Sequence, residues 1–236
     1  MKKLLNPSLA LCATLFFAAH APAQRRPAQT KVTPPPAQVK PVPIPAPTPV
    51  PTPAPEPFDG ASAERMAAQC VRLETESGTI EIMMLPDGAP ETVRNFLNLA
   101  ATGAFDTTTF SRVVRGFVIQ GGNLSTREKL TPPALAERAR RTVRDEPNAI
   151  RHTRGVVSMA RSDRPHSATT NFFILVGTAS HLDNKFAAFG RVTKGMDVVD
   201  AINKAALEGE TPLTPVRVAS AAVFACAPNT TPDVEN

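Results

Sequence analysis

The chain has 236 residues, 25 prolines and a formal net charge of +5, and it contains neither tryptophan nor tyrosine. The basic excess lies before Phe58, because the chain from Phe58 onward carries 20 basic and 20 acidic residues. A nucleic-acid surface needs a net positive field and a recognisable binding motif. Neither is present, so no nucleic-acid partner is predicted.

The first 23 residues have the pattern of an export signal. Two lysines follow the initiator methionine, and residues 9–19 (LALCATLFFAA) form an apolar run that is short for a membrane span. Residues 21–23 supply small side chains for cleavage. We therefore predict a signal peptide over 1–23, a mature start at Gln24 and a periplasmic location, with an uncleaved N-terminal anchor as the alternative.

Residues 24–57 form a low-complexity linker. This segment holds 13 of the 25 prolines, and proline stands at every second position from Pro41 to Pro57. Such a run cannot form a helix or a central strand, because each proline fixes φ and removes a backbone donor. The sequence predicts a disordered, extended polyproline II tether. A docking site for a proline-recognising partner is the alternative.

One domain is predicted over 58–227, followed by a flexible tail over 228–236. Short apolar runs bounded by turn residues predict strands, and apolar residues at helical spacing predict two amphipathic helices. The polar stretch 124–150 is a long connection in which one short helix over 133–141 can form. The predicted strands lie at 70–74, 79–84, twice within 109–120, at 155–160, 171–176, 187–192 and 216–225, and the helices at 89–101 and 196–207.

This order of elements indicates a mainly β domain. Many short strands with turn signals between them are typical of a closed antiparallel barrel or of a sandwich. Periodicity alone does not choose between these two architectures.

Residues 109–122 (TFSRVVRGFVIQGG) place an arginine within an apolar strand. Phe110, Arg112 and Val114 share one face of that strand, because side chains alternate with period two. Burying an arginine there is costly unless its donors are used. Two interpretations follow: a strand-edge arginine that reaches water, or a cationic hydrogen-bond donor at the rim of an apolar pocket.

Other catalytic groups are scarce. Three histidines follow the signal, and the sequence has no Gly-x-Ser-x-Gly and no His-Glu-x-x-His motif. Asp183 lies beside a turn and is interpreted as a turn former. We therefore predict no metal site and no cofactor. An arginine, amide side chains and apolar groups suit a reaction without a covalent step.

The predicted mature chain keeps two cysteines, Cys70 and Cys226, near the two ends of the domain. No Cys-x-x-Cys pair is present, which argues against a zinc ribbon and a thioredoxin-like site. Two cysteines in an oxidising compartment can pair. If the first and last strands are neighbours, a Cys70–Cys226 disulfide is predicted, and two separate buried thiols are the alternative.

Four collinear segments resemble the cyclophilin-type peptidyl-prolyl cis–trans isomerases, in their bacterial, exported form. The resemblance covers about residues 71–225 and implies a closed eight-stranded antiparallel barrel capped by two α-helices. It also implies rotation about peptide bonds before proline in exported proteins, which assists their folding. The segments are FSRVVRGFVIQGG (110–122), which resembles the family signature, GVVSMAR (155–161), SATTNFFI (167–174) and HLDNKFAAFGRVTKGMDVV (181–199).

The resemblance also implies the residues of the site. Arg112 falls at the signature arginine that donates to the twisted amide, and Gln120 at the glutamine that orients it. Asn171 stands where the family usually has glutamine, and His181 where it has an aromatic residue. The implied substrate-binding residues are Phe117, Val118, Ala160, Arg161, Asn171, Phe173, His181, Leu182 and Phe186.

The expected partners are proline-containing polypeptides, unfolded or exported, and the protein is expected to be a monomer. No membrane contact is expected of the mature form unless the signal is retained. A non-catalytic module that binds proline peptides, as a chaperone or scaffold, is the alternative function. A domain that acts on its own proline-rich linker is a third interpretation.

Overall fold

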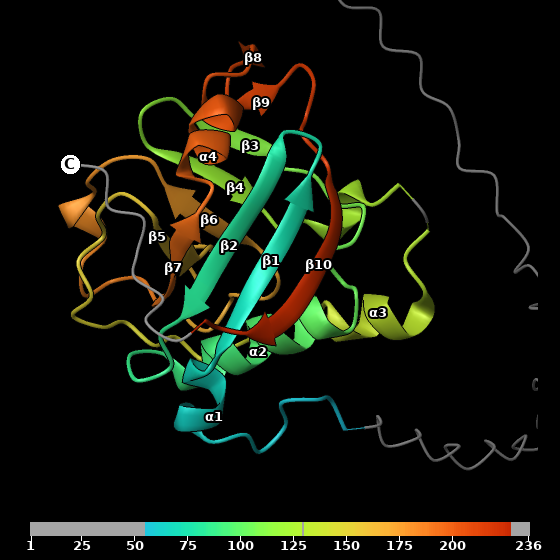
Figure 1. Cartoon of the computed structure of the whole chain (residues 1–236), viewed down its shortest axis with the longest axis vertical. Coiled ribbons are helices and arrows are strands. Elements are labelled where there is room, and N and C mark those ends of the chain that lie inside the picture. Colours follow the sequence, from blue (N-terminus) through green and yellow to red (C-terminus); the bar gives the residue numbers. More distant parts are fainter. Residues whose placement is uncertain (1–54, 129, 228–236) are drawn as a thin grey trace, which may run out of the picture. The chain divides into compact units, whose positions relative to one another are not determined.

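A computed structural model describes residues 55–128 and 130–227 (Figure 1). The predicted signal peptide over 1–23, most of the predicted linker and the predicted tail over 228–236 lie outside the described residues. Those predictions therefore remain predictions. Within the described ranges, no helix has both the length and the apolar character needed to cross a membrane.

The described part of the chain forms ten strands, four α-helices and two short 3-10 helices. Eight strands build one antiparallel sheet in the order β10-β1-β2-β7-β5-β6-β4-β3, and β8 pairs with β9 alone. The elements are α1 Ala63–Ala67, β1 Gln69–Thr75, β2 Gly78–Met84, α2 Pro90–Ala101, β3 Arg112–Val114, β4 Val118–Gly121, η1 Leu124–Thr126, α3 Pro133–Arg138, β5 Val156–Met159, β6 Phe172–Leu175, η2 Ser180–Leu182, β7 Ala188–Lys194, α4 Met196–Asn203, β8 Leu207–Glu208, β9 Thr211–Pro212 and β10 Val218–Ala225.

Helix α2 packs its apolar stripe into the core enclosed by the curved sheet. Pro90 occupies the first turn, where a missing N–H costs nothing. The carboxylate of Glu146 accepts hydrogen bonds from the backbone N–H groups of Glu91 and Thr92, at 3.0 and 2.8 Å. A side chain from the long connection therefore caps the helix, and its charge also suits the positive end of the helix dipole.

Phenylalanine rings form the centre of the core. The ring of Phe96 on α2 lies 5.1 Å from Phe105, 5.2 Å from Phe172 and 4.8 Å from Phe189, measured between centroids. All four side chains are essentially inaccessible to solvent. Tilted and edge-on ring contacts of this kind add to the free energy gained by burial, so they fix α2 against the inner face of β6 and β7.

The mainly β antiparallel fold is confirmed, but the closed barrel is wrong: the sheet is an open half-barrel. Strands β3 and β10 end the sheet, and no ladder joins them within the described residues. An isolated bridge between Thr109 and Arg217 is their nearest pairing. The outer edge of β3 is instead covered by the β8–β9 hairpin, because the Val113 N–H donates to the Glu210 carbonyl at 2.8 Å.

The described residues form four α-helices rather than two: α1 was not predicted, whereas α3 confirms the short helix expected over 133–141 and ends at Arg138. Helix α4 is shorter than predicted, since it ends at Asn203 and Leu207 belongs to β8. The last linker residues contact the domain: the Arg138 Nε donates to the Glu56 carboxylate at 2.5 Å. Ordered packing thus begins before the predicted boundary at Phe58.

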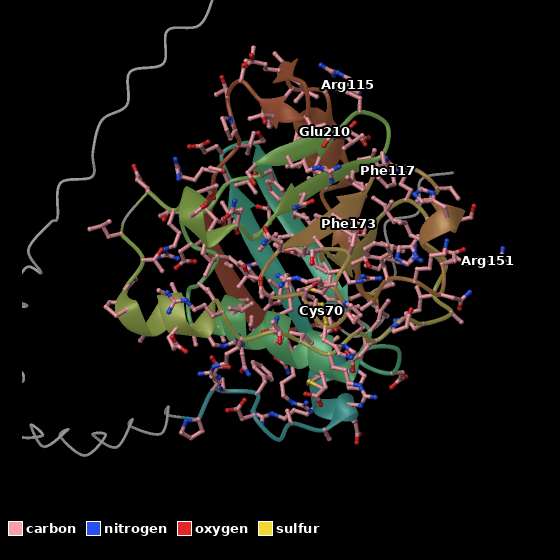
Figure 2. The ribbon with its side chains drawn as sticks, turned by 180° about the vertical axis from the view of Figure 1, so that it is seen from behind. Cys70, Arg115, Phe117, Arg151, Phe173 and Glu210 are labelled. Atoms are coloured by element: carbon pink, nitrogen blue, oxygen red, sulfur yellow. A yellow bond between two sulfur atoms is a disulfide. The ribbon has the colours of Figure 1, made fainter. Side chains whose placement is uncertain are left out.

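Cys70 and Cys226, which are 156 positions apart in the sequence, form a disulfide with their Cα atoms 5.1 Å apart. Strand β1 is paired with β10, so the two ends of the domain are neighbours, as the prediction required. The Cys226 N–H also donates to the Ala68 carbonyl at 3.0 Å. Figure 2 labels Cys70 near the α2 end of the sheet.

Candidate active site

The strand register brings Arg112, Gln120 and Phe173 into one row. Arg112 on β3 is the partner of Gln120 on β4, and Gln120 is the partner of Phe173 on β6. Directly opposed residues of antiparallel strands project to the same face of the sheet. The row faces away from the main core. Each of its residues has a fully buried neighbour in sequence that points to the other face of the sheet: Val113 after Arg112, Ile119 before Gln120 and Ile174 after Phe173.

A cleft of about 170 Å³ opens over this row. That volume is well above the roughly 10–15 Å³ that a single water molecule needs. Figure 2 shows Phe117 and Phe173, two of the aromatic side chains that line it. The full lining is Arg112, Phe117, Val118, Gln120, Ala160, Arg161, Phe173, Leu182 and Phe186.

The floor of the cleft is apolar. Val118, Phe173 and Leu182 are buried and belong to a second, smaller hydrophobic cluster outside the main core. The Phe186 ring stands edge-on to Phe173 with 6.1 Å between the centroids. Each of these residues alone would suit ordinary packing, but together they leave an open apolar surface beside Arg112.

Arg112 lies at the polar rim of the cleft, with 42% of its side chain exposed. Its Nη1 donates to the Gln120 Oε1 at 3.2 Å, and its Nε donates to the Glu210 Oε2 at 2.6 Å. The guanidinium is therefore both partly solvated and hydrogen-bonded in place. Of the two interpretations of the strand arginine, the donor at the rim of an apolar pocket describes this geometry.

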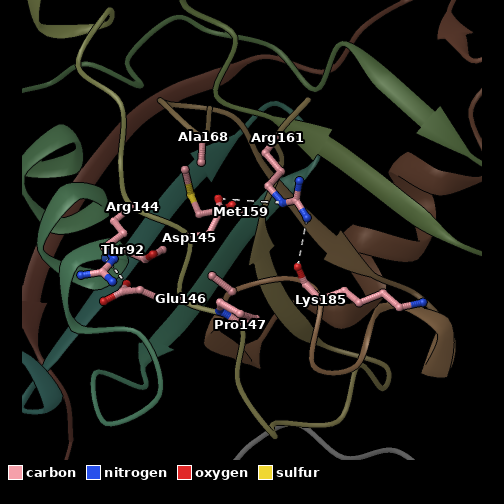
Figure 3. Close-up of a pocket in the computed structure, with 10 residues that line it drawn as sticks. Thr92, Arg144, Asp145, Glu146, Pro147, Met159, Arg161, Ala168 and Lys185 are labelled. Carbon is pink, nitrogen blue, oxygen red and sulfur yellow. Dashed lines mark hydrogen bonds and ion pairs between the residues drawn. The ribbon is translucent and has the colours of Figure 1, made fainter. Parts of the chain in front are cut away.

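Arg161 also lines the cleft. Its guanidinium lies 4.9 Å from the centre of the Phe186 ring and donates to the carbonyls of Ser162 and Lys185, at 3.0 and 3.3 Å. The same side chain lines a small neighbouring pocket beside Asp145 (Figure 3). Ala160, just before it, donates its N–H to the Asn171 carbonyl at 3.0 Å.

Two predicted site residues, Asn171 and His181, are not among the residues that line the cleft. Asn171 supports it through the backbone bond to Ala160. The exposed His181 ring lies 5.6 Å from the Phe117 ring, tilted by 35°. His181 therefore borders the cleft by covering one side of Phe117.

A buried histidine holds the loop that carries Leu182. Asp183 accepts hydrogen bonds from the His152 backbone N–H at 2.8 Å and lies 3.1 Å from its Nδ1, while the His152 Nε2 lies 3.2 Å from the Ser158 Oγ. Burial lowers the pKa of His152, against the opposing effect of Asp183. The pKa of Asp183 is lowered, first by the His152 backbone N–H. Asp183 is thus an anchor as well as a turn residue.

The Ser158–His152–Asp183 set has the residue types of a hydrolase triad but not its accessibility. Ser158 is fully buried, and its hydroxyl donates to the Ala187 carbonyl at 2.9 Å. A nucleophile must reach its substrate, so this set acts as a support for the cleft. The sequence signal for it was weak: Ser158 is six positions from His152, but Asp183 is 31 positions from it and is brought to the ring by the fold.

Asn203 fixes the turn that presents Phe117. Its amide donates to the carbonyls of Val114 and Val118, at 2.9 and 3.1 Å, and accepts from the Gly116 N–H at 2.9 Å. Gly116 has φ +69°, a left-handed conformation that favours glycine. Sequence reasoning missed Asn203, although a polar residue on the apolar face of a predicted helix was a usable signal.

The cleft offers donors and apolar contacts rather than covalent chemistry. None of the nine lining residues is a serine, threonine, cysteine, histidine or carboxylate. What the lining can supply is a positioned guanidinium and a glutamine beside an apolar recess. Such a site can bind a compact apolar ring and place a hydrogen-bond donor against an adjoining polar atom.

Comparisons with known proteins agree with this geometry. The sequence profile of the family described as cyclophilin type peptidyl-prolyl cis-trans isomerase matches residues 70–223. Over 166 residues the chain is 35% identical to peptidyl-prolyl cis-trans isomerase A of Dickeya dadantii, covering 65% of this chain and 84% of that protein. Over 142 residues it is 38% identical to peptidyl-prolyl cis-trans isomerase B of Escherichia coli, covering 56% and 82%.

Solved structures show the same fold. A cyclophilin from Hirschia baltica superposes with a TM-score of 0.56 at 24% identity, covering 66% of this chain and 74% of that one. A cyclophilin-type isomerase of Cryptosporidium parvum, crystallised in the presence of the dipeptide Ala-Pro, superposes with a TM-score of 0.58 at 22% identity, covering 66% and 99%. The chain belongs to the cyclophilin-type peptidyl-prolyl cis–trans isomerase family.

Proposed function

We propose that this protein catalyses cis–trans rotation about peptide bonds before proline in exported polypeptides and so assists their folding. The observation that carries the proposal is Arg112, held by two hydrogen bonds at the rim of an apolar cleft. Membership of the family and the named activity of the bacterial relatives support it.

The physical task is to lower a resonance barrier. Rotation about the peptide bond must pass about 18–20 kcal/mol, and without catalysis it takes roughly 10–100 s. When the amide twists, a lone pair is localised on the prolyl nitrogen. A donor that binds this nitrogen, or the adjoining carbonyl, better in the twisted state accelerates the rotation.

The cleft has the parts for such differential binding. Phe117, Phe173 and Leu182 offer an apolar surface for the proline ring, and Arg112 offers the donor beside it. Gln120 fixes the guanidinium and remains part of the lining. If these contacts remove about 7 kcal/mol from the barrier, the rate rises by roughly 10⁵. No covalent intermediate and no cofactor enter this mechanism.

A protease-coupled assay with a proline tetrapeptide tests the activity on the full chain. We expect turnover well above the uncatalysed rate, and a loss of at least about 100-fold in Arg112→Ala, since a preorganised transition-state donor commonly contributes that much. Arg115→Ala is the matched control, because this exposed arginine lies on the same hairpin outside the cleft. A wild-type rate equal to background would leave the non-catalytic peptide-binding module as the function.

The exported site of action is supported by the sequence pattern of residues 1–23. We expect mass spectrometry of the protein from its host to find a chain that begins at Gln24, in the periplasmic fraction. A protein that keeps Met1 and fractionates with membranes would identify an uncleaved anchor instead. Retention of the protein in the cytoplasm would contradict the proposal.

A further inference from the structure

We propose that Glu210 is a positioning residue for Arg112, and that it fixes the guanidinium for reaction without touching the substrate. The inference rests on the proposed isomerase function. It is carried by the 2.6 Å hydrogen bond from the Arg112 Nε to the Glu210 Oε2, across 98 positions of sequence. Figure 2 shows Glu210 labelled above Phe117 on the same side of the molecule.

Two acceptors from different elements hold the guanidinium. Gln120 on β4 binds Nη1, and Glu210 between β8 and β9 binds Nε. A planar guanidinium held at two of its three nitrogens has its plane defined. Within the described residues the third nitrogen, Nη2, has no hydrogen-bond partner, so both of its N–H groups are left to donate to a ligand in the cleft.

Glu210 is itself held by its backbone. Gly209 and Glu210 are the two residues of the hairpin turn. The φ of +61° at Gly209 suits the first central position of a type II′ turn. Glu208 and Thr211, the residues that flank this turn, are paired across the hairpin. The Glu210 carbonyl accepts a hydrogen bond from the Val113 N–H of β3 at 2.8 Å. The hairpin is therefore fixed to β3 next to Arg112, and the carboxylate is presented to Nε from a rigid turn.

Glu210 does not line the cleft, and its side chain is 55% exposed. An ion pair this exposed contributes little to the stability of the fold. The ion pair instead orients the Arg112 guanidinium, and a small displacement of a catalytic group can lower the reaction rate strongly. Removing the carboxylate should therefore change turnover and leave both folding and ground-state peptide binding nearly intact.

The test measures kcat, KM and thermal unfolding for four forms of the full chain. Glu210→Ala removes the acceptor, whereas Glu210→Gln keeps an amide oxygen for Nε. Glu208→Ala is the matched control, since Glu208 is exposed on the same hairpin and its carboxylate has no hydrogen bond or ion pair within the described residues. We expect Glu210→Ala to lower kcat about tenfold with KM within about twofold, Glu210→Gln to recover to within about threefold, and Glu208→Ala to equal the wild type.

A double-mutant cycle and a spectroscopic readout complete the test. In an Arg112→Ala background, Glu210→Ala should have no further effect on kcat, since residues that act together are not additive. The Arg112 Nε–H resonance, identified by its loss in Arg112→Ala, should be protected from exchange in wild type and Glu208→Ala and not in Glu210→Ala.

The outcomes separate this inference from the proposed function. An inactive wild type would overturn the function, and the inference with it. An active wild type with kcat unchanged in Glu210→Ala would overturn the inference alone. Equal losses in Glu210→Ala and Glu208→Ala, or an additive loss in the Arg112→Ala background, would also overturn it.

Discussion

Arg112 and Gln120 face each other across β3 and β4, and the Arg112 Nη1 donates to the Gln120 Oε1 at 3.2 Å. This contact follows directly from the register of a hairpin whose strands are only three and four residues long. The eight-residue separation of the two positions therefore places the donor and the group that orients it side by side in the cleft.

Replacing Gln120 tests this relationship. Gln120→Leu keeps the approximate shape but removes the acceptor, and a hydrogen bond to a charged group is worth about 1.5–3 kcal/mol. We expect kcat/KM to fall at least about tenfold in the peptide assay. Gln120→Glu retains an acceptor and should lose less. Equal activity of wild type and Gln120→Leu would show that Glu210 alone is enough to hold Arg112.

Phe186 at the edge of the cleft offers a test of substrate binding that leaves the fold intact. It is half-buried, whereas Phe173 beneath it is only 6% exposed. Phe173→Ala should cost about 3–5 kcal/mol of unfolding free energy, as large-to-small core substitutions do. Phe186→Ala should cost less stability but raise KM for a proline peptide several-fold. Activity at increasing peptide concentration gives KM for both variants, and denaturant unfolding gives their stability. An unchanged KM in Phe186→Ala would place the proline away from this ring.

Local patterns predicted most of the fold because they report burial. The alternating apolar runs around Ser77-Gly78 became β1 and β2, and the helical spacing after Pro90 became α2. The predicted strand pair in 109–120 became β3 and β4 with a turn at Arg115-Gly116. Resemblance to the family supplied the site residues, and nine of the eleven proposed for catalysis and binding line the cleft.

What the sequence did not predict depends on contacts between distant segments. The short β8–β9 hairpin has no apolar alternation, so it was not predicted and nothing in the local sequence singled out Glu210. That hairpin covers the outer edge of β3 through the bond from the Val113 N–H to the Glu210 carbonyl, a contact that no local pattern encodes. The buried His152 was counted only as a scarce catalytic group, since its partners Ser158 and Asp183 are brought to it by the fold.

The Cys70–Cys226 disulfide should contribute strongly to stability and weakly to activity. It closes a loop of 156 residues, for which chain-entropy estimates give about 4–5 kcal/mol. We expect dithiothreitol, or a Cys70→Ser/Cys226→Ser double variant, to lower the free energy of unfolding by up to that amount in urea titrations. Activity under native conditions should persist, because neither cysteine lines the cleft. Dithiothreitol should not affect the double variant, and a full loss of activity in folded double variant would contradict the prediction.

His152 should make the fold sensitive to mild acid. Burial lowers its pKa below the ordinary value of 6.5, so near that pH the unfolded chain binds more protons than the folded one. The stabilising effect of the neutral buried ring is thus present above about pH 6.5 and is lost as the pH falls through the unfolded and then the folded pKa. Each unit of lowering corresponds to about 1.4 kcal/mol.

This dependence is separable from that of Asp183. Its pKa is also lowered by folding, from an ordinary value of 3.8, so its contribution is lost only at more acidic pH. We expect the urea concentration at the unfolding midpoint of the wild type to decrease as the pH is lowered from 7.5 to 5. The midpoint of His166→Gln, a variant at an exposed position, should decrease by the same amount. His152→Gln should be less stable at pH 7.5 but flatter over this range. His152→Gln has no titratable ring between the Leu182 loop and β5. If its urea midpoint fell with pH as steeply as that of the wild type, the acid sensitivity would belong to other groups.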